Sequence, residues 1–598
     1  MHRAFLFLIL AVFAVGVSGQ APAPGFDLAN YGVRIEPDKR LIVVLAALEM
    51  ATAKNAAGVD EKLLSTPLSD LGTKFREQLL KDTESLPKDL RQRISTFVAQ
   101  YKKRNPKATD AEIVAPFISM AYTLTPVPEL ADPVITSDLP GNLLDVLDFA
   151  PLVRDFYRSS VIGSKLDKYV NDTRLIADGN LRASTRDMVS DLLDYLHTRP
   201  QLIFSERVKV ETRKGASKTQ VLTKFEIREH DRHFYVVPEN LAPKGNVNFL
   251  NIRDDYYVII PPDAAINNAE GRRSFLQFVV DPIVLSKSKE IEPMRAWAKP
   301  LLDEMRKTNP NITPDIFLTL SRSLVAAIDV RQSQYYKGRI ATEQARQKIA
   351  QLKTEDEKRA FSKELDRFKE SLDDEATLQL YEDYQKGSVL AFYFAEQLKG
   401  IEDSGFDIAS SMREMIATFD PAKETARVAG TAEARKRAVA AREDRKNRPD
   451  NRMLVAENPV TTRLIEIQKL INAKDLAKAN TELKQLLAQN PSEPRIYYNI
   501  GRVAALAAVG MEDRDLQAQK LLEAKVAYTN VIRSATTVTD KALISLTYVA
   551  LARIYEYDGN EAYALKLYDE AIKLTDIAGG GFQEAIAAKQ RLIKPQQP

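Results

Sequence analysis

The stretch SLTYVALARIYEYDGNEAYALKLYDEAIKLTD, residues 545–576, decides the fold of the C-terminal part of this chain. It holds two segments of helical periodicity separated by a turn at Gly559. Two antiparallel helices in contact need small residues opposite large ones, and glycine suits the turn between them. The residues in those positions are Tyr548, Leu551, Ala552, Tyr555, Gly559, Ala564, Tyr568 and Ala571. The stretch predicts a helix–turn–helix repeat, an architecture that holds partners and carries no chemistry of its own.

Two more copies of the pattern precede this stretch. The middle copy has Gly501 in its first helix and Tyr528 in its second, with extra residues at 510–519 that we expect to form a loop. The first copy is weaker and begins at Ile467, 34 residues before Gly501. A period of 34 residues and this order of small and aromatic residues resemble the tetratricopeptide family. The alternative is a plain antiparallel helical bundle.

The resemblance implies that three helix pairs stack into a curved array, with the first helix of each pair lining the concave face. The side chains expected to point into this groove are Tyr498, Arg502, Arg553 and Glu556. Two arginines beside an aromatic ring suit a peptide carboxylate or an acidic segment, so the predicted partner is a protein or peptide. The alternative for each of these residues is an ordinary surface position.

The N-terminal residues predict export. A short positive start at Met1-His2-Arg3 precedes an apolar run of 14 residues and the small residues Ser18 and Gly19. This order is typical of a cleaved signal peptide (1–19), which a Pro/Ala spacer follows (20–25). A permanent membrane helix needs about 20 apolar residues, so an uncleaved anchor is the weaker alternative. We expect no membrane span in the mature chain.

The composition of the chain limits the cellular locations and the classes of partner that we expect. The chain has no cysteine, which excludes disulfides, thiolate metal sites, cysteine nucleophiles and a lipidated cysteine anchor. We therefore expect an exported bacterial protein, periplasmic or extracellular, that is not lipid-anchored. Its 85 basic and 82 acidic residues give a net charge of +3, which argues against nucleic acid as a partner. No pattern in the sequence indicates an oligomeric state.

Residues 26–420 predict an α+β domain that is mostly helical. Helical periodicity covers most of this range, but residues 201–262 switch to a period of two, with β-branched and aromatic runs between turns. We expect these runs to form a small, mostly antiparallel sheet. Residues 421–458 are poor in large apolar side chains and read as a charged linker. The TPR-like repeat domain then covers residues 459–598.

One segment of the α+β domain occupies the position of a metal-binding motif but lacks the metal ligands. The segment GRRSFLQFVVDP, residues 271–282, opens a helix after a strand pair. The order of elements over 26–420 resembles exported bacterial proteins that are distantly similar to gluzincin zinc metallopeptidases. Active members carry H-E-x-x-H on this helix, because side chains at i and i+4 share a face and grip one zinc ion. The corresponding residues here are Arg273, Ser274 and Gln277.

All three residues depart from that motif. Arginine does not deprotonate to ligate zinc, and serine is no substitute for a carboxylate base. The resemblance offers Glu382 or Glu396 as a third ligand, but one carboxylate does not hold a catalytic zinc. We therefore predict a peptidase scaffold with no metal, no cofactor and no catalytic residue from this motif. The alternative is an unrelated α+β domain with an ordinary core helix.

Other catalytic patterns are weak. His230 and His233 lie three apart in a predicted strand, so they point to opposite faces and make a poor metal site. His197 falls at a predicted helix end, where a structural role is expected. The sequence has no G-x-S-x-G elbow and no glycine-rich phosphate loop.

Together these observations predict an exported, non-catalytic scaffold that binds a protein through its C-terminal repeats. The metal-less peptidase-like domain would supply a second binding surface. The competing prediction is a divergent exported hydrolase, peptidase-like, that uses another site in the α+β domain.

Overall fold

The computed structural model describes residues 26–54, 58–133, 143–214, 220–245, 247–402, 405, 407–447, 459–537, 539–577 and 579–593. They form two compact units. The larger is Leu28–Ile465, and the smaller joins the residues up to Asp27 with Glu466–Pro598. The predicted signal peptide (1–19) and spacer (20–25) lie outside the described residues. Among the residues that are described, none of the helices is long and apolar enough to cross a membrane.

The first core of the larger unit forms around helix α1 (Lys39–Glu49). Asp38 begins this helix by accepting a hydrogen bond from the backbone N–H of Arg40 at 2.8 Å. Every residue from Leu41 to Leu48 is buried, so neighbouring elements cover all sides of α1. The surrounding helices are η1 (Leu28–Tyr31), α2 (Asp70–Asp82), α3 (Lys88–Arg104), α4 (Asp110–Thr123), α5 (Leu144–Leu147), α6 (Ala150–Ser159) and α7 (Ile162–Leu196).

The sheet of the larger unit is mixed, which corrects the prediction of a mostly antiparallel sheet. Its strand order is β1 (Val33–Ile35), β6 (Phe234–Pro238), β8 (Asp255–Ile260), β7 (Asn248–Ile252). β6 pairs in parallel with both β1 and β8, and only β7 is antiparallel to its neighbour. The physical reason is that β1 comes from about 200 residues upstream and supplies a parallel partner that no local turn signal reveals.

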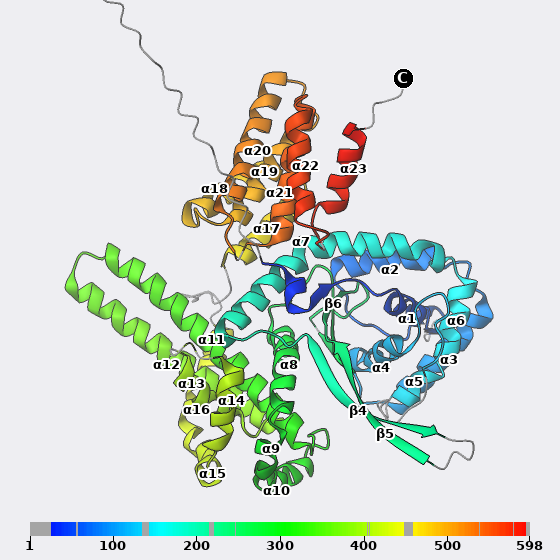
Figure 1. The fold of residues 1–598 in the computed structure, drawn as a ribbon, viewed down its shortest axis with the longest axis vertical. Coiled ribbons are helices and arrows are strands. Elements are labelled where there is room, and N and C mark those ends of the chain that lie inside the picture. The colour runs from blue at the N-terminus through cyan, green and yellow to red at the C-terminus, as the bar shows by residue number, and fades with distance from the viewer. Residues whose placement is uncertain are drawn as a thin grey trace, which may run out of the picture. The chain divides into compact units, whose positions relative to one another are not determined.

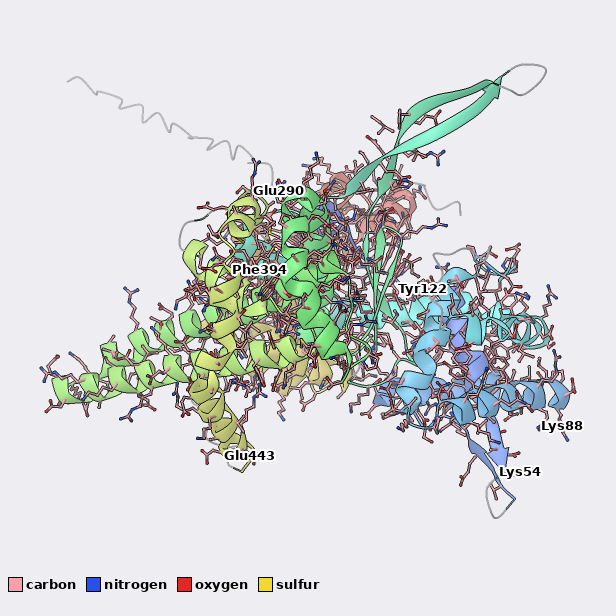
Figure 2. All side chains as sticks on the ribbon, turned by 90° about the horizontal axis from the view of Figure 1, so that it is seen from below. Lys54, Lys88, Tyr122, Glu290, Phe394 and Glu443 are labelled. Atoms are coloured by element: carbon pink, nitrogen blue, oxygen red, sulfur yellow. The ribbon has the colours of Figure 1, made fainter. Side chains whose placement is uncertain are left out.

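The two longest strands do not join that sheet. β4 (Ile203–Lys214) and β5 (Gln220–Asp231) pair only with each other, in an antiparallel hairpin. Figure 2 shows this hairpin projecting from the body of the larger unit, whereas Phe394 lies deep among other side chains. A second, short hairpin consists of β2 (Thr52–Lys54) and β3 (Asp60–Lys62).

The second half of the larger unit is built on long helices. Helix α8 (Ala269–Leu285) packs on α11 (Ile316–Gln351), and α11 packs on α12 (Glu355–Gln385) and α13 (Ala391–Ile401). Thr354 and Glu357 cap α12 reciprocally, so the chain reverses sharply between α11 and α12. The two helices form a long helical hairpin (Figure 1). The smaller elements here are α9 (Ser288–Ile291), η3 (Glu292–Met294), α10 (Arg295–Arg306) and α14 (Ile408–Ala417).

The predicted charged linker is largely helical, which is a second correction. Residues 421–447 form α15 (Pro421–Gly430) and α16 (Ala432–Asn447), and the larger unit continues to Ile465. The basic side chains of α16 pair with carboxylates of α12. Arg437 donates to Asp374 at 2.6 and 2.7 Å, and Arg442 donates to Glu382 at 2.6 Å. Charge pairing therefore helps to hold α16 to the unit, since its apolar residues other than Val439 are alanines.

The smaller unit is a run of packed helices. Gly501 lies against Tyr528, where an added Cβ would be only 2.7 Å from the tyrosine ring, and Ala552 is fully buried. Residues 514–519, within the expected loop, are helical instead because Asp513 caps a longer helix. Phe26 joins this unit through backbone hydrogen bonds with Thr539 and Lys541. Its helices are α17 (Pro459–Asn472, which contains the boundary), α18 (Leu476–Gln489), α19 (Pro494–Ala508), α20 (Arg514–Ser534), α21 (Lys541–Tyr557), α22 (Glu561–Lys573) and α23 (Phe582–Ile593).

Candidate functional site

A polar seam runs along the contact between α8 and α11. Arg273, Gln277 and Asp281 are spaced four residues apart, so they share one face of α8. Arg273 contacts Asp329 of α11, and Asp281 contacts Ser321 of the same helix. The later residue of α8, Asp281, contacts the earlier residue of α11, Ser321, so the two helices run antiparallel. Polar groups thus replace apolar ones over two turns of a helix that is otherwise largely buried.

Arg273 lies between two buried carboxylates. Its Nε donates to Asp329 at 2.8 Å, and its two Nη atoms donate to the two oxygens of Asp383, each at 2.7 Å. Arg272 donates to the other oxygen of Asp329 at 2.7 Å. Burial works to lower the pKa of Arg273, but the hydrogen bonds and charges of Asp383 and Asp329 outweigh it and raise the pKa. The guanidinium is a fixed cation that joins α8, α11 and α12.

The donors at this position do not fit a zinc ion. Arg273 offers only N–H groups, and the Ser274 hydroxyl is used within the helix, donating to the carbonyl oxygen of Glu270 at 2.7 Å. Gln277 hydrogen-bonds to Asp281. Across the described ranges, no group of three His, Asp or Glu residues is placed to hold a metal ion. The proposed third ligands are engaged elsewhere: Glu382 pairs with Arg442, and Glu396 lies 4.0 Å from Arg427.

The prediction that His230 and His233 lie in one strand is wrong, because His230 lies in β5 and His233 lies in the link between β5 and β6. The ring of His230 lies 3.3 Å from Glu206 across the β4–β5 hairpin, and the ring of His233 lies 3.2 Å from Asp255. The two histidines therefore meet different carboxylates. His197 ends α7 in a left-handed backbone conformation with φ of 51°.

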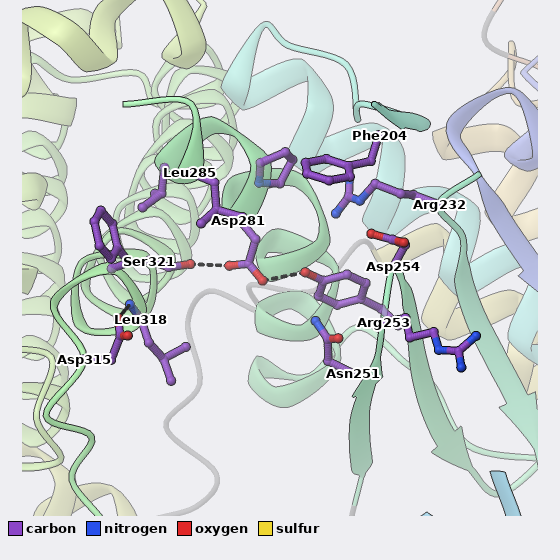
Figure 3. A pocket seen from close by; sticks show the side chains of 14 residues that line it. Phe204, Arg232, Asn251, Arg253, Asp254, Asp281, Leu285, Asp315, Leu318 and Ser321 are labelled. Atoms are coloured by element: carbon purple, nitrogen blue, oxygen red, sulfur yellow. Dashed lines mark hydrogen bonds between the residues drawn. The ribbon is translucent and has the colours of Figure 1, made fainter. Parts of the chain in front are cut away.

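The seam ends in a cavity of about 420 Å³, which we call the α8–α11 pocket (Figure 3). The end of α8, the start of α11, the β7–β8 turn and the start of β4 enclose it. Apolar side chains form one part of its wall and polar side chains the other. The apolar part includes Phe204, Pro282, Val284, Leu285, Phe317 and Leu318, and the polar part includes Arg232, Asn251, Arg253, Asp254, Tyr256, Asp281, Asp315 and Ser321.

Asp281 is the central polar group of this pocket. One oxygen accepts a hydrogen bond from the Tyr256 hydroxyl at 2.5 Å and the other accepts one from the Ser321 hydroxyl, as the dashed lines in Figure 3 show. Burial raises the pKa of Asp281, while the hydrogen bonds from Ser321, Tyr256 and Gln277 and the charge of Arg232 partly offset that effect. The groups that hydrogen-bond to Asp281 are thus neutral donors.

In the smaller unit, the structure brings three of the four predicted groove residues together. The Tyr498 ring of α19 lies 5.8 Å from the Tyr528 ring of α20. Burial raises the pKa of Tyr498, and the charges of both Arg502 and Arg553 act on the same hydroxyl to lower it, so both arginines are close. Arg502 donates to Gln468 at 2.7 Å, and Arg553 pairs with Glu584 at 2.6 Å. We call Tyr498, Arg502 and Arg553 the repeat surface.

Glu556, the fourth predicted residue, is engaged elsewhere. It accepts hydrogen bonds from the Tyr568 hydroxyl at 2.8 Å and from Arg591 at 2.6 Å. Its carboxylate therefore ties α21 to α22 and α23. Sequence reasoning missed two residues that pair with the repeat surface, Gln468 with Arg502 and Glu584 with Arg553. Both lie on helices outside the two best copies of the repeat, where the pattern gave no signal for a groove position.

Comparisons with known proteins returned no match: no family model, no curated protein and no solved structure is similar to this chain.

Proposed function

We propose that this protein is an exported, non-catalytic scaffold that binds a protein partner through its C-terminal helical repeats. The observation that carries the proposal is the position of Arg502 and Arg553. They come from the first helices of two successive pairs and lie beside one tyrosine pair. A guanidinium has five N–H donors, and Arg502 uses one of them on Gln468. The remaining donors suit a carboxylate, which arginine binds in a bidentate manner.

The partner we propose is an acidic peptide segment or a free C-terminal carboxylate. The side chain of Arg553 is 64% exposed and its only ion-pair partner among the described residues is Glu584, a carboxylate of the chain itself. An incoming carboxylate would replace Glu584 at this arginine. The half-buried Tyr498 ring would contact the apolar part of the peptide, since aromatic side chains supply most of the energy at such surfaces.

Peptide binding tests this proposal. Fluorescence anisotropy would compare labelled acidic peptides that end in a free carboxylate with the same peptides ending in an amide. We expect the free acids to bind, and Arg502→Glu together with Arg553→Glu to weaken binding at least about tenfold. Lys566→Glu, on the exposed face of α22, is the matched control and should bind as the wild type does. Glu584→Gln should strengthen binding, because it removes the competing carboxylate.

The alternative function, a divergent exported hydrolase, predicts different results. A hydrolase would cleave casein, and a peptidase of the gluzincin kind would carry stoichiometric zinc. We expect neither from purified full-length protein, because Arg273 donates hydrogen bonds at the position where such a peptidase places its first metal ligand. Unchanged peptide binding in the double arginine variant, or casein cleavage by the purified chain, would favour the hydrolase.

A further inference from the structure

The α8–α11 pocket has an acidic polar side that the repeat surface does not explain. Asp254, Asp281 and Asp315 line it, and none of the three forms an ion pair in the part of the chain that the structure describes. Asp315 caps α11 by accepting a hydrogen bond from Leu318 N at 2.9 Å. Asp281 is more enclosed and accepts only from neutral groups. An unpaired carboxylate in a partly apolar cavity is costly, and a bound cation would lower that cost.

Neither arginine of the pocket forms a direct ion pair with Asp281, although the charge of Arg232 lowers the pKa of this carboxylate. Arg232 is buried, and it donates to the carbonyl oxygens of Gln201 at 2.6 Å and Phe278 at 2.9 Å. Its guanidinium lies over the rings of Phe278 and Tyr256, which holds it in place. Arg253 occupies the β7–β8 turn, with φ of 57°, and its guanidinium points away from Asp281 (Figure 3).

The remaining wall of the pocket is apolar. Phe204 and Leu285 lie at one end of the cavity and Phe317 and Leu318 contribute from the first turn of α11. Leu285 is 54% exposed although it is a large apolar residue, so it offers contact area to a ligand. The volume of about 420 Å³ is within the range of small-molecule sites.

We propose that the α8–α11 pocket binds a ligand that carries an ammonium group on an aliphatic chain. The ammonium group donates to Asp281, whose two oxygens accept three hydrogen bonds from the protein and have capacity for one more. The aliphatic chain lies against Phe204, Leu285 and Phe317. This chemistry is common to free alkylamines and to the lysine side chain of a peptide.

Calorimetric titration of the full-length chain tests the proposal. We expect hexylamine to bind at least about tenfold more tightly than hexanoate, because only the amine complements Asp281, and more tightly than methylamine, because each buried methylene adds affinity. A peptide with one central lysine and blocked ends forms the second arm. Binding of this peptide identifies the lysine side chain as the ligand, and binding of hexylamine alone identifies a free amine. Equal affinity for hexylamine and hexanoate would overturn the proposal.

Two variants locate the binding in this pocket. Asp281→Asn should reduce hexylamine affinity at least about tenfold. Leu285→Lys changes an exposed residue one turn beyond Asp281, and its own ammonium group should occupy the site and abolish binding without unfolding the chain. Asp303→Asn, on the exposed side of α10, is the matched control and should leave affinity unchanged. Wild-type affinity in both pocket variants would contradict the assignment. Because these probes are amines, their failure leaves the acidic-peptide proposal for the repeats unaffected.

Discussion

Buried between Asp329 and Asp383, the guanidinium of Arg273 links α8 to α11 and α12 through charge. Each ion taken out of water costs several kcal/mol, and the geometry of the pairing offsets that cost. Asp329 has a second partner in Arg272, but Asp383 depends on Arg273 alone among the ion pairs of the described residues. Loss of Arg273 would therefore leave Asp383 without an ion-pair partner, whereas Asp329 would still pair with Arg272.

This asymmetry gives the first prediction. Arg273→Met should lower the free energy of unfolding by about 3–5 kcal/mol, because it leaves Asp383 buried and unpaired. Arg273→Met combined with Asp383→Leu should recover most of the loss, since Arg272 still pairs with Asp329. Urea denaturation of the full chain, followed by circular dichroism, measures both. Arg295→Met breaks an exposed pair with Glu292 and should cost at most about 1 kcal/mol. Equal losses in the single and double variants would refute this account.

Glu239 gives a prediction for pH. It is 1% exposed and follows β6, with one oxygen accepting from Leu241 N at 2.9 Å and the other buried without a hydrogen-bond partner. Burial raises its pKa from 4.5 to about 7; backbone hydrogen bonds from Leu241 and Asn240 oppose the rise, and the charge of Asp38 adds to it. The folded chain thus holds this proton at pH values where the unfolded chain releases it. Its contribution to stability is complete below about pH 4.5 and is lost as pH rises to about 7.

Glu239→Gln should remove this dependence. The variant should be more stable than the wild type at neutral pH, and the difference should shrink as pH falls toward 4.5, by about 2–4 kcal/mol in total. Melting temperatures of both proteins across this pH range measure it. Glu304→Gln, at an exposed glutamate, is the control and should follow the wild type at each pH. A constant difference between Glu239→Gln and wild type would show that Glu239 does not titrate in this window.

At the scale of elements, the periodicity of the sequence predicted the helices, because helices depend on contacts between residues that are near one another in the chain. The mostly helical character of residues 26–420 and the packed helices of the C-terminal part follow from the spacing of their apolar residues. The pairing of the strands in the sheet could not be predicted in this way. β1 and β6 pair across about 200 residues, and nothing near either strand identifies its partner. The linker prediction failed for a related reason: the arginines of α16 are solvated in isolation, and only the carboxylates of α12 make them a packing surface.

The same limit applies to the candidate sites. The spacing of residues 273–277 placed Arg273, Ser274 and Gln277 on one helix, and the structure confirms that helix. Asp329 and Asp383 lie on α11 and α12, far along the chain from Arg273, and no local pattern identifies them as its partners. Asp281 followed the motif by one turn, but its partners Tyr256 and Ser321 come from a strand and another helix.

Two helical glycines give the third prediction, since one is packed and the other is not. A Cβ at Gly501 would lie 2.7–3.0 Å from the ring of Tyr528, which is itself buried. Gly501→Ala should therefore destabilise the smaller unit by about 1–3 kcal/mol despite the better helix propensity of alanine. Gly338→Ala in α11 meets nothing within 4 Å and should stabilise by about 0.5–1 kcal/mol. Thermal melts compare the pair, and a rise in melting temperature for both would refute close packing at Gly501.

At the scale of the whole molecule, each unit has a core of its own. The core of the larger unit includes α1 and the rings of Phe117 and Phe149, and that of the smaller includes Tyr528 and Tyr568. A unit with its own core unfolds as a cooperative step, and the heat it absorbs grows with its number of residues. Since Leu28–Ile465 is much longer than the smaller unit, its step should absorb more heat.

Differential scanning calorimetry of the full chain should therefore show two transitions of unequal size. Gly501→Ala should lower the temperature of the smaller transition only, because its clash with Tyr528 lies within that unit. Arg273→Met should lower the temperature of the larger transition only, because Asp329 and Asp383 both belong to the larger unit. A single transition that both substitutions move would mean that the two cores melt as one. In that case, binding at the repeats would change the stability of the α8–α11 pocket, because the two sites would share one unfolding equilibrium.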